Sequence, residues 1–204
     1  MIKEEFFRSL TNYSSDNDLH MVLWNDIFKN YSKSNRYYHN LTHLDSLLSE
    51  LTPHKDKFLN WDVIVFSIAY HDVVYNTLKS NNEEKSGEFA RKALAGITFP
   101  DEQILQCEQI ILATKKHEAS NFETNLFTDA DLSILGSEPE EYKEYFTKIR
   151  REYSIYPDLV YNPGRRKVLI HFLGFDKIFK TSEFSTRYES KARVNLQQEL
   201  DSLL

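Results

Sequence analysis

The chain has 204 residues and a formal net charge of −6 at pH 7, and its hydrophobic content of 41% with 14% aromatic residues excludes a disordered protein. Its five glycines and five prolines are too few for the turns of an all-β fold of many short strands. The acidic balance argues against a general binder of nucleic acid or of an anionic membrane.

The expected elements are helices that follow one another without a repeat or a linker, so we predict an all-α, single-domain helical bundle over residues 1–204. Apolar residues recur at helical spacing in segments at 18–31, 36–51, 61–76, 82–95, 101–115, a short stretch from Thr128 to Gly136, about 137–153, 163–173 and 185–203. Asp16 or Asn17 is expected to cap the first of these helices, and Ser137 with Glu140 to form a capping box.

Two histidines occupy the polar segment RYYHNLTH at 36–43. His39 and His43 are four residues apart, so one turn of a helix would place both imidazoles on the same face. That arrangement suits a shared ion or substrate. It also fits a pair of exposed histidines without a function.

The segment AYHDVVY at 69–75 places His71 and Asp72 inside the most apolar stretch of the chain. An unpaired charge buried there would cost several kcal/mol, so its environment must compensate for it. A hydrogen bond between the two side chains is one solution. A divalent cation is the better one, because it accepts both a neutral imidazole nitrogen and a carboxylate oxygen.

The segment TDADLSILG at 128–136 supplies two aspartates. Asp129 lies near the expected start of a helix, where an Asp commonly acts as the cap. Asp131 lies inside that helix, where helix propensity gives no reason for it. We therefore assign Asp131 to the ion and Asp129 to the cap, with the reverse assignment as the alternative.

This order of residues resembles the H…HD…D signature of the HD-domain superfamily of metal-dependent phosphohydrolases. The elements RxYHNLxHL, HDVVY, NExxS, DADLxILG, IRxEY, GRxxVL and ARxNLxxEL look like the predicted phosphohydrolase group of bacterial genomes, and they cover nearly the whole chain. The resemblance implies a bundle of the HD-domain type in which four side chains hold one divalent ion: His43, His71, Asp72 and Asp131. Nitrogen and oxygen donors without a thiolate suit Mn, Fe, Co, Ni, Zn or Mg.

The same resemblance implies hydrolysis of a phosphate ester or anhydride, with a nucleotide as the expected substrate. YHNxxH also resembles the signature of the cyclic-nucleotide phosphodiesterases, which implies that His39 is the general acid, although the other motifs of that family are not recognisable. Arg36 and Lys115 are the candidates for phosphate contact. Glu83 is a candidate for orienting water or an acidic residue in a helix first turn, and His117 a candidate for a second ion.

Two other functions remain open from the residues alone. One is a metal- or nucleotide-binding regulatory module without turnover. The other is a di-iron oxygenase of the HD type, which needs additional histidines between the HD pair and the last aspartate, where only His117 occurs.

The chain carries no evident export or membrane signal. A single cysteine, Cys107, no secretory leader and no apolar run longer than 63–70 predict a soluble cytoplasmic protein. We expect a small phosphorylated substrate, no nucleic-acid or membrane partner, and leave a homo-oligomer open.

Overall fold

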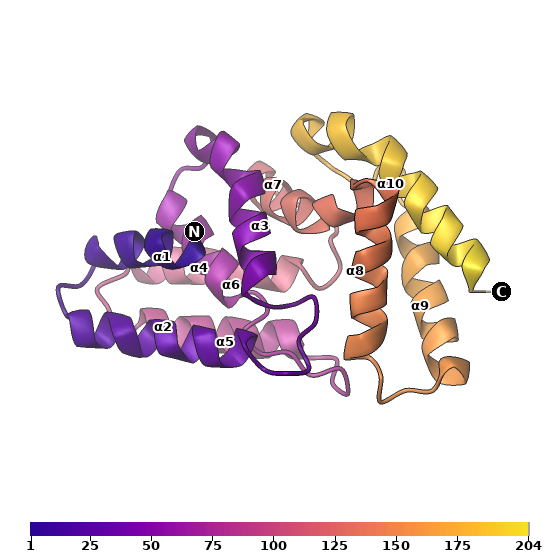
Figure 1. Cartoon of the computed structure of the whole chain (residues 1–204). Helices are drawn as coiled ribbons and strands as arrows, with labels where there is room; N and C mark the ends of the chain where they lie inside the picture. Colours follow the sequence, from indigo (N-terminus) through magenta and orange to yellow (C-terminus); the bar gives the residue numbers. More distant parts are fainter. Residues whose placement is uncertain (204) are drawn as a thin grey trace. The chain divides into compact units, whose positions relative to one another are not determined.

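A computed structural model describes residues 1–203, and every regular element in that range is a helix (Figure 1). The elements are α1 (Ile2–Thr11), α2 (Asn17–Tyr31), α3 (Leu41–Leu51), η1 (Thr52–Lys57), α4 (Trp61–Tyr70), α5 (Asn82–Leu94), α6 (Asp101–Ala113), α7 (Phe122–Asp131), η2 (Leu132–Gly136), α8 (Pro139–Glu152), α9 (Asp158–Leu173) and α10 (Ser182–Ser202). The chain divides into two compact units, Met1–Glu118 and Ala119–Leu204. The all-α prediction is confirmed, and a single domain of the HD type stays a prediction.

The first unit is organised around α4, whose residues from Val63 to Tyr70 are all buried. Helices α1, α3, α5 and α6 each pack against it. The ring of Phe6 on α1 meets the rings of Phe66 and Tyr70 on α4 at centroid distances of 5.6 and 6.0 Å. Each such buried aromatic side chain stabilises the unit by about 1.5–3 kcal/mol. This packing holds the C-terminal end of α4 in place, and with it the start of the segment that follows Tyr70.

The second unit is organised around α10, which packs against η2, α7 and α9. The buried Asn195 of α10 donates its side-chain N–H groups to the carbonyl oxygens of Leu135 and Ser137, at 2.9 and 3.0 Å. These bonds fix the short segment between η2 and α8 on α10.

Several predicted helix boundaries are wrong. The helix expected from residue 36 begins at Leu41, since the Asn40 side chain caps it by accepting the Thr42 N–H. The helix expected over 61–76 ends at Tyr70. Asp16 caps α2 as predicted.

The second unit departs from prediction as well. The capping box is absent, because the N-cap of α8 is Glu138 and its side chain makes no cap bond. Helix α9 begins at Asp158 and contains Pro163, where we expected a helix start. The proline is tolerated because the carbonyl that loses its N–H partner belongs to Leu159, which is exposed and open to water. Helix α1 was not predicted at all.

Alanine substitutions at two glycines of the second unit are expected to change its stability in opposite directions. A Cβ at Gly136 would lie 2.5 Å from Cβ and 2.8 Å from Cα of Tyr188 on α10, whereas one at Gly164 in α9 would meet nothing within 4 Å. Gly136→Ala should therefore lower the free energy of unfolding by about 1–3 kcal/mol. Gly164→Ala should raise it by about 0.5–1 kcal/mol, because alanine favours the helix. Urea unfolding measures both, and equal stability of Gly136→Ala and wild type would contradict the packing of η2 on α10.

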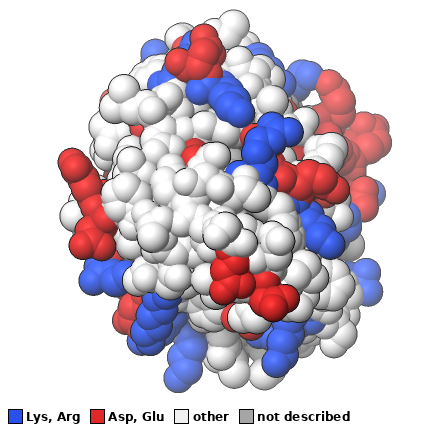
Figure 2. All heavy atoms as spheres, turned by 90° about the vertical axis from the view of Figure 1, so that its left-hand side faces the viewer, with Lys and Arg blue, Asp and Glu red and all other residues white. Residues whose placement is uncertain are grey.

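The described helices include none that is both long and apolar enough to cross a lipid bilayer. Figure 2 shows one face of the molecule, on which acidic and basic side chains border a broad uncharged area together. Positive side chains on this face thus have negative neighbours, whereas a surface that attracts a polyanion is uniformly positive.

Candidate metal centre

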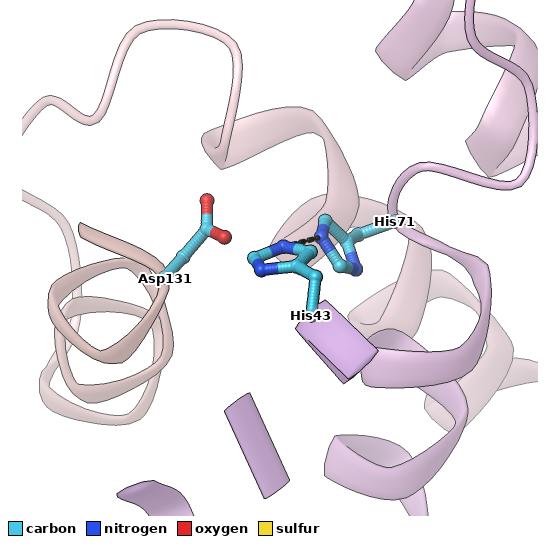
Figure 3. A group of neighbouring side chains, drawn as sticks. All are labelled: His43, His71 and Asp131. Carbon is cyan, nitrogen blue, oxygen red and sulfur yellow. Dashed lines mark hydrogen bonds between the residues drawn. The ribbon is translucent and has the colours of Figure 1, made fainter. Parts of the chain in front are cut away.

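Two buried histidines of the first unit meet across the ends of two helices. His43 lies in the first turn of α3, directly after the Asn40 cap, and His71 is the C-cap residue of α4. Their Nε2 atoms are 3.1 Å apart, as the dashed line in Figure 3 marks. The end of one helix and the start of another therefore place two imidazole nitrogens in contact.

The hydrogen bonds of His71 determine which of its nitrogens carries a proton. Its Nδ1 lies 3.0 Å from the carbonyl oxygen of Ile68, and a carbonyl only accepts, so Nδ1–H is the donor. The Nε2 atom of a neutral His71 ring is then an acceptor. It lies 3.1 Å from Nε2 of His43 and 3.2 Å from Oδ2 of Asp72.

The two contacts of His71 Nε2 have the spacing that two ligand atoms of one ion would have. Two ligand atoms bonded at right angles to one ion, at about 2.1 Å each, are about 3.0 Å apart. Acceptor atoms at that separation repel one another unless a proton or a cation lies among them. One proton bridges one pair of atoms, whereas a cation binds all three. The donor types of His43, His71 and Asp72, and the two contacts of His71 Nε2, thus fit a divalent cation.

His39 also lies near His43 and Asp72, but, contrary to our expectation, the two histidines do not share a helix face. It lies before α3 in a bend, so no helical turn joins it to His43. The two rings are nevertheless 5.8 Å apart between centroids, and His39 Nε2 is 3.9 Å from Oδ2 of Asp72. The His39 ring also packs on Tyr75 at a centroid distance of 4.4 Å. His39 is only partly buried, so its imidazole is accessible beside the cluster.

The two aspartates belong to the second unit, near the end of α7 rather than its start. Asp129 is fully buried, and its carboxylate accepts the N–H groups of Lys180 and Thr181 and the Thr181 hydroxyl, at 2.7–3.0 Å. It therefore holds the two residues just before α10 and does not cap its own helix as we expected, because α7 begins at Phe122. Asp131 is the last residue of α7. The bonds of Asp129 favour Asp131 as the aspartate for an ion.

Arg36 is placed differently from a phosphate-binding side chain. It is 5% exposed, and its guanidinium donates to the carbonyl oxygens of His39, Asp72 and Val73 at 3.1, 2.7 and 3.1 Å. Its placement favours a role in holding the backbone over contact with phosphate.

Lys115 and Glu83 lie together in the first unit. The Lys115 ammonium donates to the Ser80 carbonyl at 2.6 Å and to the Glu84 carboxylate, and it lies 3.7 Å from Oε2 of Glu83. The hydrogen bond to Glu84 raises the pKa of Lys115, so the ammonium stays charged. Glu83 occupies the first turn of α5, which was one of its two predicted roles.

His117, which the sequence left as a candidate for a second ion, follows α6, and the single cysteine, Cys107, is buried in that helix. His117 adopts a left-handed backbone with φ of 53° after α6, and its N–H donates to the Ala113 carbonyl. Its part in a second metal site stays a prediction. Burial raises the pKa of the Cys107 thiol to about 12, so it is not a nucleophile at neutral pH.

The sequence missed the residues that hold the segment after the HD pair. The Asn82 side chain accepts the Asn76 N–H at 3.0 Å and donates to the Asn76 carbonyl at 3.1 Å. The Ser86 hydroxyl accepts the Val74 N–H at 3.1 Å. Asn82 and Ser86 belong to the NExxS element that the sequence analysis noted, but no rule of sequence spacing predicts that they bind residues 74–76.

Comparison of the chain with protein-family models, with curated proteins and with solved structures gave no match. The functional conclusion therefore depends on the side chains of the centre.

Proposed function

We propose that this chain is a metal-dependent phosphohydrolase of the HD-domain type, which cleaves a phosphate ester or anhydride, with a nucleotide as the expected substrate. One observation carries the proposal: Nε2 of the buried His71 lies 3.1 Å from Nε2 of His43 and 3.2 Å from Oδ2 of Asp72. A divalent cation bound there supplies a Lewis acid that polarises a phosphoryl oxygen and acidifies water.

Asp131 is the fourth ligand in this proposal. With His43 and His71 it forms a set of residue types that could hold a metal ion, and Figure 3 draws these three side chains. Two nitrogen and two carboxylate donors suit the divalent ions from Mn to Zn and also Mg. The carboxylates of Asp72 and Asp131 would offset the charge of the ion.

His39 is assigned as the general acid. Its imidazole is accessible, stands 3.9 Å from Oδ2 of Asp72, and is held by the face of Tyr75. An imidazole holds and releases a proton near neutral pH, which suits donation to a leaving oxygen. Lys115 and Glu83, a charged pair near the start of α5, stay candidates for phosphate contact and for orienting the attacking water.

His39→Gln is the variant that separates catalysis from metal binding. We expect kcat to fall about 10²- to 10⁴-fold, because proton donation is lost, while the bound metal per chain is unchanged. Phosphate release from a panel of nucleoside mono-, di- and triphosphates, together with elemental analysis, measures both quantities. His171→Gln, at an exposed histidine of α9, is the matched control and should retain both.

Three outcomes of this experiment count against the proposal. Metal binding without hydrolysis of any phosphate ester would favour the regulatory module. Two irons per chain with oxygen consumption would favour the di-iron oxygenase. Full turnover in the His39→Gln variant would remove His39 from the mechanism.

A further inference from the structure

Arg36 occupies an unusual position for a cationic side chain, because it is buried between two aromatic rings of the first unit. Its guanidinium carbon lies 4.8 Å from the ring centre of Tyr31 and 5.2 Å from that of Tyr75. Guanidinium groups stack well on aromatic faces, since they are planar and weakly hydrated. The stacking leaves the N–H groups directed outward in the plane of the guanidinium.

Those N–H groups connect the two segments that carry the proposed chemistry. Nη1 donates both to the carbonyl of His39, the assigned acid, and to the carbonyl of Asp72, an assigned ligand. Nη2 donates to the carbonyl of Val73, the next residue. One side chain therefore fixes the bend before α3 relative to the turn after α4.

Tyr31 holds the same turn through its hydroxyl group. The backbone N–H of Asp72 donates to Tyr31 Oη at 3.0 Å, while the backbone carbonyl of Asp72 accepts from Arg36 at 2.7 Å. The peptide groups on both sides of Asp72 are thus held by side chains. The helical hydrogen bonds of α4 end at His71, so these contacts replace them in setting the direction of Asp72.

We propose that Arg36 and Tyr31 are positioning residues that set the backbone of Asp72, and through it the affinity and geometry of the metal centre. This inference rests on the proposed function. It replaces the predicted phosphate contact of Arg36, because Nη1 and Nη2 donate to the carbonyls of His39, Asp72 and Val73 and the remaining nitrogen, Nε, is buried. Lysine cannot substitute, since a single ammonium lacks the planar fork and the stacking face.

The test uses the full chain with two substitutions of different severity. Tyr31→Phe keeps the ring and removes only the hydroxyl that accepts the Asp72 N–H. Arg36→Lys keeps the charge and removes the fork. Arg193→Lys is the matched control, because Arg193 of the second unit also donates to backbone carbonyls, those of Leu173, Phe175 and Asp176.

Cobalt(II) titration is the measurement, with the visible absorption spectrum of the bound ion as a readout that general destabilisation would not change. We expect Tyr31→Phe and Arg36→Lys to weaken Co²⁺ binding about 10- to 100-fold, in the range known for residues that orient metal ligands, and to shift the spectrum. Arg193→Lys should bind Co²⁺ with the wild-type constant and spectrum. Thermal unfolding without metal verifies that each variant is folded.

Failure of this inference is distinguishable from failure of the proposed function. No Co²⁺ binding by the wild-type chain would overturn the metal centre itself. Wild-type affinity and spectrum in folded Tyr31→Phe would overturn the positioning role while the centre stands. A raised KM for substrate with unchanged Co²⁺ binding in Arg36→Lys would overturn the positioning role of Arg36 and support its originally predicted contact with phosphate. Should Arg36→Lys not fold, the Tyr31→Phe result decides.

Discussion

His71→Ala is expected to weaken the binding of a divalent cation by more than about 100-fold. Removal of residues that merely orient metal ligands costs about 10- to 100-fold, and His71 is proposed as a ligand itself. Its Nε2 is the atom common to both short contacts, 3.1 Å to His43 and 3.2 Å to Asp72. Without His71, both of these contacts are lost. Isothermal titration with Mn²⁺ measures the loss directly.

The control for this variant is another buried histidine of the same unit. His20 on α2 is as deeply buried as His71 and packs on the edge of Phe7. His20→Ala should therefore lower stability by a similar mechanism, the loss of packing, while it leaves Mn²⁺ affinity unchanged. Equal affinity in the wild type and in folded His71→Ala would contradict the assignment of His71.

Glu199→Gln is expected to produce the largest loss of stability. The two oxygens of Glu199 accept from Nε and Nη2 of Arg165 at 2.7 and 2.8 Å, and both side chains are buried. Tyr142 donates its hydroxyl proton to the same carboxylate. Burial, together with the charge of Glu199, raises the pKa of Tyr142, so this hydroxyl remains a donor at all ordinary pH values.

Removal of the Glu199 charge leaves the Arg165 guanidinium buried without a counter-ion. Breaking a buried pair in this way costs about 3–5 kcal/mol. Urea unfolding should show this loss in the free energy of unfolding. Glu138→Gln is the control, because its pair with Lys191 is largely exposed and should contribute at most about 1 kcal/mol. A loss no larger than in that control would contradict the buried network.

The periodicity of apolar residues was sufficient to predict most helices, since each buries one face. It was insufficient for their ends, which depend on side-chain hydrogen bonds. Asn40 starts α3 by capping it, and Asp129 binds the residues just before α10, far away in sequence. Helix α1 was missed, although Phe6 and Leu10 on one face of it are fully buried.

The site was predictable to the extent that its chemistry is local. A His-Asp pair next to a segment that is apolar except for Ser67 requires compensation, and that physical argument singles out His71 and Asp72 from one sequence. The contribution of Tyr31 was not predictable, because its hydroxyl meets the Asp72 N–H across 41 positions of the chain. Arg36 was selected for its charge, but the aromatic rings around it and the carbonyls in its plane appear only in three dimensions.

Elemental analysis of the protein purified without added metal tests the central claim most directly. The account predicts about one divalent ion per chain in the wild type, bound by nitrogen and oxygen donors, and almost none in Asp72→Ala prepared in parallel. A wild-type chain that is free of metal and binds none on titration, or equal metal content in the two proteins, would contradict it.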